Sequence, residues 1–133
     1  MPLYIRSSLP DDLELLASDI VDAVLEVRQV LGRGLLERGY TDALAFELAD
    51  RGHAVEREVV MSFEYKGRTV ERAYRIDILV DRRAVIECKI VDELRREHYA
   101  QVATYLRMSG NRLGFLVNFD AVPIGSGIKR IVR

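Results

Sequence analysis

Three stretches of the chain carry apolar residues every three or four positions, the spacing typical of amphipathic α-helices. They cover residues 11–31, about 35–51, and 93–109, where Asp92 can cap the third helix. A joint with two glycines, Gly32-Arg33-Gly34, separates the first two stretches and can end the first helix. We therefore expect two helices early in the chain and a third one late.

Between the second and third helical stretches, apolar and β-branched residues alternate with polar ones, which predicts strands. The alternation covers residues 55–65, 69–80 and 84–90, and polar turns at 66–68 and 81–83 separate the segments. Spacing of this kind predicts three consecutive antiparallel strands joined by hairpins.

After the third helix, the mostly apolar run 113–119 predicts a buried strand. Because a helix precedes it, we expect this strand to lie parallel to another one through a crossover. Residues 128–132 are either a short final strand or a tail. The order of elements predicts one α/β domain over residues 1–133 with a mixed sheet.

The strands at 69–80 and 84–90 hold charged residues among apolar ones. Strand alternation places Ile76 and Ile78 on one face and Asp77 on the other. It likewise places Glu87 and Lys89 together on one face of the next strand. If the apolar faces point into the core, Asp77, Glu87 and Lys89 meet on the opposite side. Such groups are costly to bury without a purpose.

The charge balance excludes a global basic field that would attract nucleic acid. Lysine and arginine number 20 against 21 acidic residues, for a net charge of −1, so nucleic-acid binding needs a local basic patch. The one cysteine, Cys88, lies at an expected inward strand position and permits neither an internal disulfide nor a CxxC metal site. A signal peptide and a long apolar run are absent, which predicts a soluble cytoplasmic protein with no membrane partner.

Two neighbouring carboxylates, Asp77 and Glu87, would repel each other unless a cation joins them. Oxygen ligands suit Mg²⁺ or Mn²⁺, and the backbone carbonyl of Cys88 could add one more. Lys89 could hold a phosphate oxygen or an attacking water, so the group suits phosphodiester hydrolysis. On the residues alone, an Asp and a Glu/Lys pair on a solvated sheet face is an equally open interpretation. The chain also contains a second Glu-x-Lys, at 64–66, which runs into a glycine turn.

Other candidate residues allow two interpretations each. Glu37 stands one turn before Tyr40 near a helix start, where an acid is favoured by the helix dipole alone. His98 lies on the helical stripe that contains Gln101, and it either faces the site or packs. With His53 it completes the histidines of the chain, which leaves too few partners for a zinc site.

Taken together, these residues resemble a known pattern. Asp77…Glu87-x-Lys89 is similar to the motif of the PD-(D/E)XK nuclease superfamily, whose core order αβββαβ matches the elements expected from residue 35 onward. The segment Gly34-Leu35-Leu36-Glu37-Arg38-Gly39-Tyr40 resembles the motif that names the bacterial GxxExxY proteins. Further matches are Glu47-Leu48, Tyr65-Lys66-Gly67, Arg75-Ile76-Asp77, His98-x-x-Gln101-x-x-x-Tyr105-Leu106, Asn118-Phe119 and Gly127-Ile128-Lys129-Arg130.

This resemblance covers about residues 20–132, with small departures. Ile76 replaces the proline of the superfamily's name, and Cys88 fills the x position where leucine is usual. Arg33 and Arg28 stand where proline and histidine are common in the GxxExxY proteins. None of these departures removes an expected metal ligand or the lysine.

The resemblance implies a restriction-endonuclease-like αβββαβ core, a mixed sheet flanked by helices, with an extra N-terminal helix. It implies a metal-dependent nuclease or phosphodiesterase whose catalytic and supporting residues are Asp77, Glu87, Lys89, Glu37 and Gln101. Asp77, Glu87 and the carbonyl of Cys88 would hold Mg²⁺ or Mn²⁺, with Glu37 as a further ligand. Lys89 would position or activate the water.

The expected partner is nucleic acid, DNA in preference to RNA. The alternative function is a non-catalytic module that binds nucleic acid or protein and retains the nuclease fold. The near-neutral charge of so small a chain also favours work as a homodimer or with a protein partner.

Overall fold

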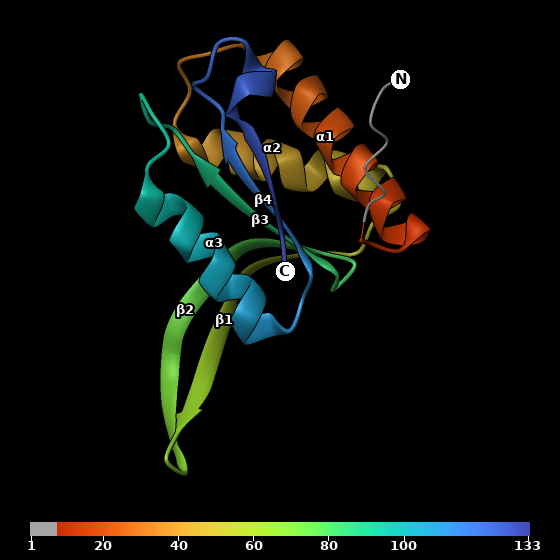
Figure 1. The fold of residues 1–133 in the computed structure, drawn as a ribbon. Helices are drawn as coiled ribbons and strands as arrows, with labels where there is room; N and C mark the ends of the chain where they lie inside the picture. The colour runs from red at the N-terminus through yellow and green to blue at the C-terminus, as the bar shows by residue number, and fades with distance from the viewer. Residues whose placement is uncertain (1–7) are drawn as a thin grey trace, which may run out of the picture.

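The computed structural model describes residues 8–133, and its centre is a five-stranded sheet with helices on both faces (Figure 1). The helices are α1 (Asp11–Leu31), α2 (Glu37–Asp50) and α3 (Arg96–Ser109). The strands are β1 (Val55–Tyr65), β2 (Arg68–Val80), β3 (Ala84–Lys89), β4 (Leu113–Asn118) and β5 (Ile128–Val132), and a 3₁₀ turn, η1 (Ile124–Gly127), precedes β5. The predicted α/β order is confirmed, and residues 128–132 form a strand.

The strands lie in the order β1-β2-β3-β4-β5 across the sheet. The first three form the expected antiparallel meander, and β4 lies parallel to β3 through the crossover helix α3. The edge strand β5 returns antiparallel to β4. Within residues 8–133, none of the helices combines the length and apolar character that crossing a bilayer requires.

Buried side chains form one cluster on each face of the sheet. The first packs α1 and α2 against the residues Ile78, Val80, Ala84, Ile86, Cys88, Leu113, Phe115 and Val117. The second packs α3 against the residues Ile76, Leu79, Val85 and Leu116. Cys88 is fully buried, which confirms its predicted inward position. Both faces of β3 are therefore covered, so its polar residues lie at the edge of a core.

The second and third helices begin later than predicted. α2 begins two residues later than expected, and α3 begins at Arg96 instead of directly after Asp92. The side-chain amide of Asn118 bonds both the N–H and the C=O of Val91, at 3.2 and 2.8 Å, and so holds the chain past β3. Nδ1 of His98 then accepts the backbone N–H of Arg95 at 2.9 Å, which fixes the helix start.

Strict alternation along β2 was also a wrong prediction at one point. Ile76 packs in the α3 cluster, whereas Ile78 packs in the cluster of α1 and α2. The pairing of β2 with β3 stops at the Ile78–Ile86 pair. The β1 residue opposite Asp77, Glu58, has a left-handed φ of 50°. This irregularity turns the strand around Asp77.

A histidine ties α1 to the turn between β2 and β3. Nε2 of His53 contacts Asp19, and Nδ1 bonds Oδ2 of Asp81 at 2.7 Å. Burial lowers the pKa of His53, but the hydrogen bonds to the two carboxylates outweigh it, so the pKa is raised above its usual value of 6.5. The protonated imidazolium therefore stabilises the fold.

Replacing His53 by glutamine should lower the free energy of unfolding by about 1 kcal/mol more at pH 5.5 than at pH 9. A raised folded-state pKa means that the stabilisation is fully present below the unfolded-state value of 6.5. It is lost as the pH rises through the folded-state pKa. Urea unfolding of parent and variant at both pH values measures the difference, and an equal loss at the two would contradict it.

Candidate active site

The candidate site lies where β2 separates from β3. Beyond the Ile78–Ile86 pair the two strands no longer bond each other. Asp77 extends its side chain into this gap, where Oδ2 accepts the backbone N–H of Cys88 at 3.0 Å. The N–H and C=O of one strand residue point to the same neighbouring strand, so the carbonyl of Cys88 also faces the gap. One carboxylate and one backbone carbonyl thus meet there.

Glu87 and Lys89 lie on the face of β3 that α3 covers. The Glu87 side chain is only 4% exposed, and its Oε2 pairs with Nζ of Lys89 at 3.1 Å. Its Oε1 is buried and accepts no hydrogen bond from the residues that the structure describes. A buried carboxylate oxygen without a hydrogen-bond partner raises the free energy of the folded state, and binding a proton or a cation at this atom would lower it.

The charges of Asp77 and Lys89 both shift the pKa of Glu87. Burial raises the pKa of Glu87 well above its usual range, and the carboxylate of Asp77 raises it further, while Lys89 opposes both. Burial and the charge of Glu87 also raise the pKa of Tyr105 on α3. The structure therefore brings Asp77, Glu87 and Lys89 together, as the sequence predicted, and adds Tyr105 at their side.

Glu37, the first residue of α2, faces the same opening as Asp77. A pocket of about 630 Å³ is lined by Glu37, Arg38, Thr41, Asp42, Arg57, Glu58, Arg75 and Asp77. Partial burial raises the pKa of Glu37, and so does the carboxylate of Asp77, while Lys89 lowers it. Glu37 thus begins α2 and is also close enough to Asp77 and Lys89 for their charges to shift its pKa. The helix-dipole interpretation alone does not explain this shift.

The structure does not favour direct binding of one metal ion by the three carboxylates of Asp77, Glu87 and Glu37. Among residues 8–133, no three or more His, Cys, Asp or Glu side chains lie close enough together to hold a metal ion. Glu37 is solvent-accessible and lies across the pocket from Asp77. The oxygen donors at the gap itself are the carboxylate of Asp77 and the carbonyl of Cys88. The Glu87 carboxylate lies on the face that α3 covers, close enough for the charge of Asp77 to raise its pKa. Hard oxygen donors of this kind fit Mg²⁺ or Mn²⁺, and the unpartnered Oε1 of Glu87 gives a cation a place to bind.

Tyr40 explains why a glycine joint, an acid and a tyrosine occur at their fixed spacing. Its buried ring stacks on Phe119 with the ring centroids 4.8 Å apart. Its hydroxyl donates to the carbonyl of Gly32 at 2.6 Å and accepts the N–H of Leu35 at 3.3 Å. The two glycines of the joint have left-handed φ, which lets the chain turn there. Tyr40 therefore holds the joint that sets Glu37 at the start of α2.

Replacing Tyr40 by phenylalanine should lower the free energy of unfolding by about 1–2 kcal/mol, because the carbonyl of Gly32 loses its hydroxyl donor. The ring and its stacking on Phe119 remain, so the fold should persist. Urea unfolding measures the loss. The half-exposed Tyr99 on α3 provides a matched control, because Tyr99→Phe should change stability by less than about 0.5 kcal/mol. Equal effects of the two variants would contradict the role of the Tyr40 hydroxyl.

Two residues near the site were not among the predicted ones. Tyr105 links Gln101 to the site, because Nε2 of Gln101 donates to the Tyr105 hydroxyl at 2.9 Å. Thr41 is buried and donates to the carbonyl of Glu37 at 3.0 Å. Its position four residues after Glu37 gave the available signal, since such residues share a helix face. His98 bonds the start of α3, which favours its structural interpretation.

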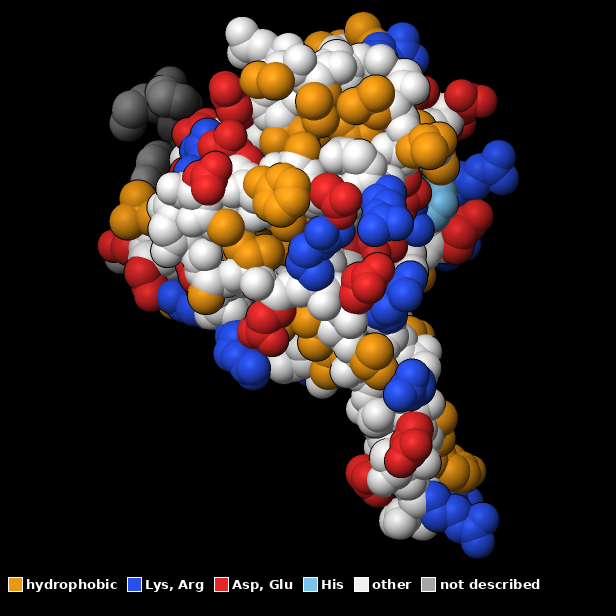
Figure 2. Space-filling view, turned by 180° about the vertical axis from the view of Figure 1, so that it is seen from behind, with side chains coloured by type: hydrophobic (Ala, Val, Ile, Leu, Met, Phe, Trp, Pro, Cys, Tyr) orange, Lys and Arg blue, Asp and Glu red, His pale blue; other side chains and the backbone are white. Residues whose placement is uncertain are grey.

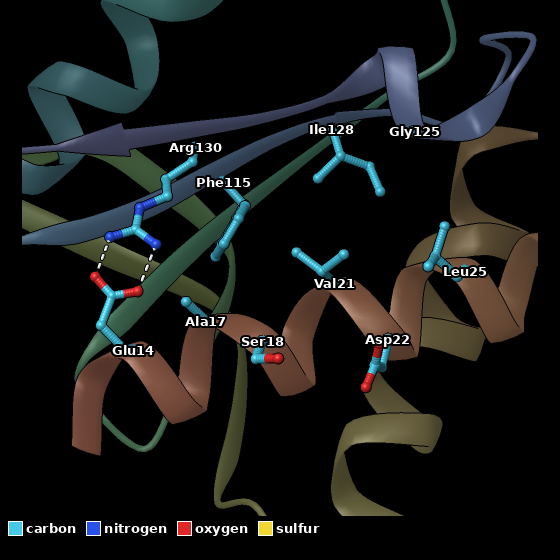
Figure 3. A pocket seen from close by; sticks show the side chains of 10 residues that line it. All are labelled: Glu14, Ala17, Ser18, Val21, Asp22, Leu25, Phe115, Gly125, Ile128 and Arg130. Carbon is cyan, nitrogen blue, oxygen red and sulfur yellow. Dashed lines mark hydrogen bonds and ion pairs between the residues drawn. The ribbon is translucent and has the colours of Figure 1, made fainter. Parts of the chain in front are cut away.

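A second pocket lies away from this site, between α1 and the strands β4 and β5 (Figure 3). Its volume is about 440 Å³, and Val21, Phe115 and Ile128 give it an apolar lining. At one end Glu14 and Arg130 form a two-pronged ion pair, with one contact of 2.7 Å between Oε2 and Nη1. None of the predicted site residues lines this pocket, so it is separate from the candidate active site.

A family model described as the PD-(D/E)XK nuclease superfamily matches residues 14–131. The matched range includes every residue of the candidate site. No curated protein and no solved structure matches the chain.

Proposed function

The chain belongs to the PD-(D/E)XK nuclease superfamily, and we propose that it is a metal-dependent nuclease that hydrolyses phosphodiester bonds, built as one domain over residues 1–133. The observation that carries this proposal is the environment of Glu87. One of its buried oxygens pairs with Lys89, and the other accepts no hydrogen bond from the described residues. A purely structural ion pair has no need for an unsatisfied oxygen beside a second carboxylate.

In this proposal Asp77, Glu87 and the backbone carbonyl of Cys88 hold Mg²⁺ or Mn²⁺. A metal bound by these atoms supplies charge stabilisation at the phosphate and a more acidic water. One oxygen of Asp77, Oδ2, accepts the N–H of Cys88 where β2 separates from β3, which holds this carboxylate next to the carbonyl of Cys88 before a metal binds.

Lys89 positions the reacting groups. Its side chain is 20% exposed, so the ammonium keeps access to solvent while Oε2 of Glu87 orients it. It donates to the attacking water or to a phosphate oxygen. Glu37 acts from across the pocket through water, and Gln101 acts through the hydroxyl of Tyr105.

In this proposal the phosphate backbone of the substrate binds in the pocket in front of Asp77. Arg38, Arg57 and Arg75 line this pocket. A guanidinium group can donate two parallel hydrogen bonds to the oxygens of one phosphate. Arg57 and Arg38 both contact Asp42, which fixes them at the rim. These side chains support nucleic acid as the substrate.

We also assign the chain to the GxxExxY proteins within the superfamily. Gly34 has a φ of 97°, a conformation that favours glycine. Glu37 lines the pocket of Asp77, and Tyr40 binds the joint between the first two helices. Each of the three motif residues thus has a physical role at this site.

The test is an incubation of the protein with duplex DNA, single-stranded DNA and RNA, in Mg²⁺, in Mn²⁺ and in excess chelator. We expect cleavage of DNA that depends on the metal and stops with the chelator. Intact substrates in every condition, together with measurable binding of DNA, would instead favour the non-catalytic module. Cleavage that survives the chelator would point to a contaminating enzyme.

A further inference from the structure

The hairpin of β1 and β2 extends far beyond the rest of the sheet (Figure 1). β2 pairs with β3 only over residues 78–80, whereas β1 and β2 stay paired as far as Tyr65 and Arg68. We call residues 62–73 the arm. Most of its side chains are exposed. A two-stranded ribbon without other support is only marginally stable, so the arm contributes little to the core.

The arm nevertheless has a defined shape. At its tip Lys66 and Gly67 both have left-handed φ, 48° and 78°, as in the two-residue turns that match the twist of a hairpin. Near its base the strand register shifts, and Arg72 has a left-handed φ of 51°. The N–H of Arg72 donates to Oγ of Ser62 at 3.3 Å. Bulges of this kind bend and twist a ribbon in a set direction.

Cationic side chains without carboxylate partners gather on the arm. Lys66, Arg68 and Arg72 form no ion pair with any residue in the described range, whereas Arg51, Arg82 and Arg83 each pair with a carboxylate elsewhere. Figure 2 shows basic side chains at the free end of the arm.

The tip of the arm also holds an exposed aromatic ring, Tyr65, and an acid, Glu64, whose carboxylate is hydrogen-bonded within the arm. Tyr65 is 59% exposed, and Nζ of Lys66 lies 5.4 Å from its ring centroid. The acid nearest the turn, Glu64, accepts the hydroxyl of Thr69 at 2.6 Å. The tip therefore presents a cationic and aromatic surface to solvent in a chain whose net charge is −1.

The arm is continuous with the candidate active site. Arg57 and Arg75, near its base, line the pocket that contains Asp77. β2 advances nine residues from Arg68 to Asp77. At about 3.3 Å per residue the strand covers about 30 Å. One turn of B-form DNA rises by about 34 Å.

We propose that the arm binds duplex DNA about one helical turn from the phosphate that is cleaved. A two-stranded ribbon fits the major groove of B-form DNA, which is about 12 Å wide. The major groove of duplex RNA is too deep and narrow for protein side chains to read. Lys66 and Arg68 neutralise backbone phosphates, and Tyr65 adds an apolar contact. This inference rests on the proposed nuclease function and specifies its substrate as duplex DNA that is long enough to reach the tip.

The test compares the affinity for a 30-base-pair duplex with that for an 8-base-pair duplex, by fluorescence anisotropy. A Lys89→Met background keeps the DNA intact during the measurement. Adding Lys66→Gln and Arg68→Gln should raise the Kd for the long duplex about 10-fold near 0.1 M salt. The slope of log Kd against log salt should fall by about 2, one for each lost phosphate contact. The Kd for the short duplex should stay unchanged.

The matched control is Arg82→Gln with Arg83→Gln, which removes the same charge from the turn between β2 and β3. It should keep the parent's Kd and salt slope on both duplexes. Equal melting temperatures of the two double variants and the parent show that folding is unaffected.

Three outcomes would overturn the proposal. In the first, the arm variant binds the long duplex as tightly as the parent does. In the second, it loses the same affinity for both duplex lengths. In the third, sedimentation shows a dimer for the parent and a monomer for the arm variant, which would mean that the arm binds a second copy of the chain. These outcomes are separate from failure of the nuclease proposal. That proposal fails when the wild-type chain leaves duplex DNA, single-stranded DNA and RNA all intact with either metal, whatever the arm binds.

Discussion

Replacing Lys89 by methionine should lower the rate constant for DNA cleavage by about 10²- to 10⁴-fold, the range for loss of a positioned proton-transfer group. Methionine keeps a long apolar side chain and removes the ammonium that pairs with Oε2 of Glu87 at 3.1 Å. The water and the phosphate then lose their donor. Single-turnover cleavage at saturating metal and protein measures the rate constant without a contribution from product release.

Lys129→Met is the matched control for this experiment. Lys129 lies on the edge strand β5 and lines a pocket with Asp92 and Asn118, away from Asp77. Its loss should leave the rate constant within about 2-fold, since surface substitutions away from a site have small effects. A Lys89→Met protein that retains more than a tenth of the parent's rate constant would remove Lys89 from the chemical step.

Replacing Asp77 by asparagine should abolish stabilisation of the fold by Mn²⁺ or Mg²⁺. For the parent, metal at 100 times its Kd should raise the free energy of unfolding by about 2.7 kcal/mol, because only the folded chain presents the site. Asparagine can still accept the N–H of Cys88 but provides no negative charge for a cation. Thermal unfolding at increasing metal concentration measures the shift.

Without metal, Asp77→Asn should leave the fold as stable as the parent or more stable. The charge of Asp77 raises the pKa of the buried Glu87, so the two carboxylates repel each other in the parent. Asp50→Asn, at the exposed end of α2, is the control and should show the parent's full response to metal. An equal metal response in Asp77→Asn and the parent would place the metal elsewhere.

The sequence by itself determined the elements of the fold and the pairing of charges on β3. Its alternation fixed Cys88 inward and put Glu87 with Lys89, because β3 is regular and both of its faces are covered. A period of two is a local property of the backbone, so no distant contact was needed to predict it. The glycine joint likewise predicted the break between the first two helices, although α2 begins two residues later than expected.

The tertiary structure alone decided where that regularity ends. Whether β2 stays paired with β3 depends on contacts between segments distant in sequence, which alternation does not encode. Ile76 and Ile78 therefore pack on opposite faces despite their equal pattern. The same separation let Asp77 bond the backbone of β3 and left β1 and β2 to continue as an arm.

Contacts across the fold also decided the environment of two acids. Glu37 lines the same pocket as Asp77 because Tyr40, one turn further along α2, stacks on Phe119, a residue distant in sequence. The burial of Glu87 depends on α3, which the sequence places after it without saying which face it covers. Local patterns specify backbone geometry, whereas burial and the resulting pKa shifts depend on which distant segments pack together.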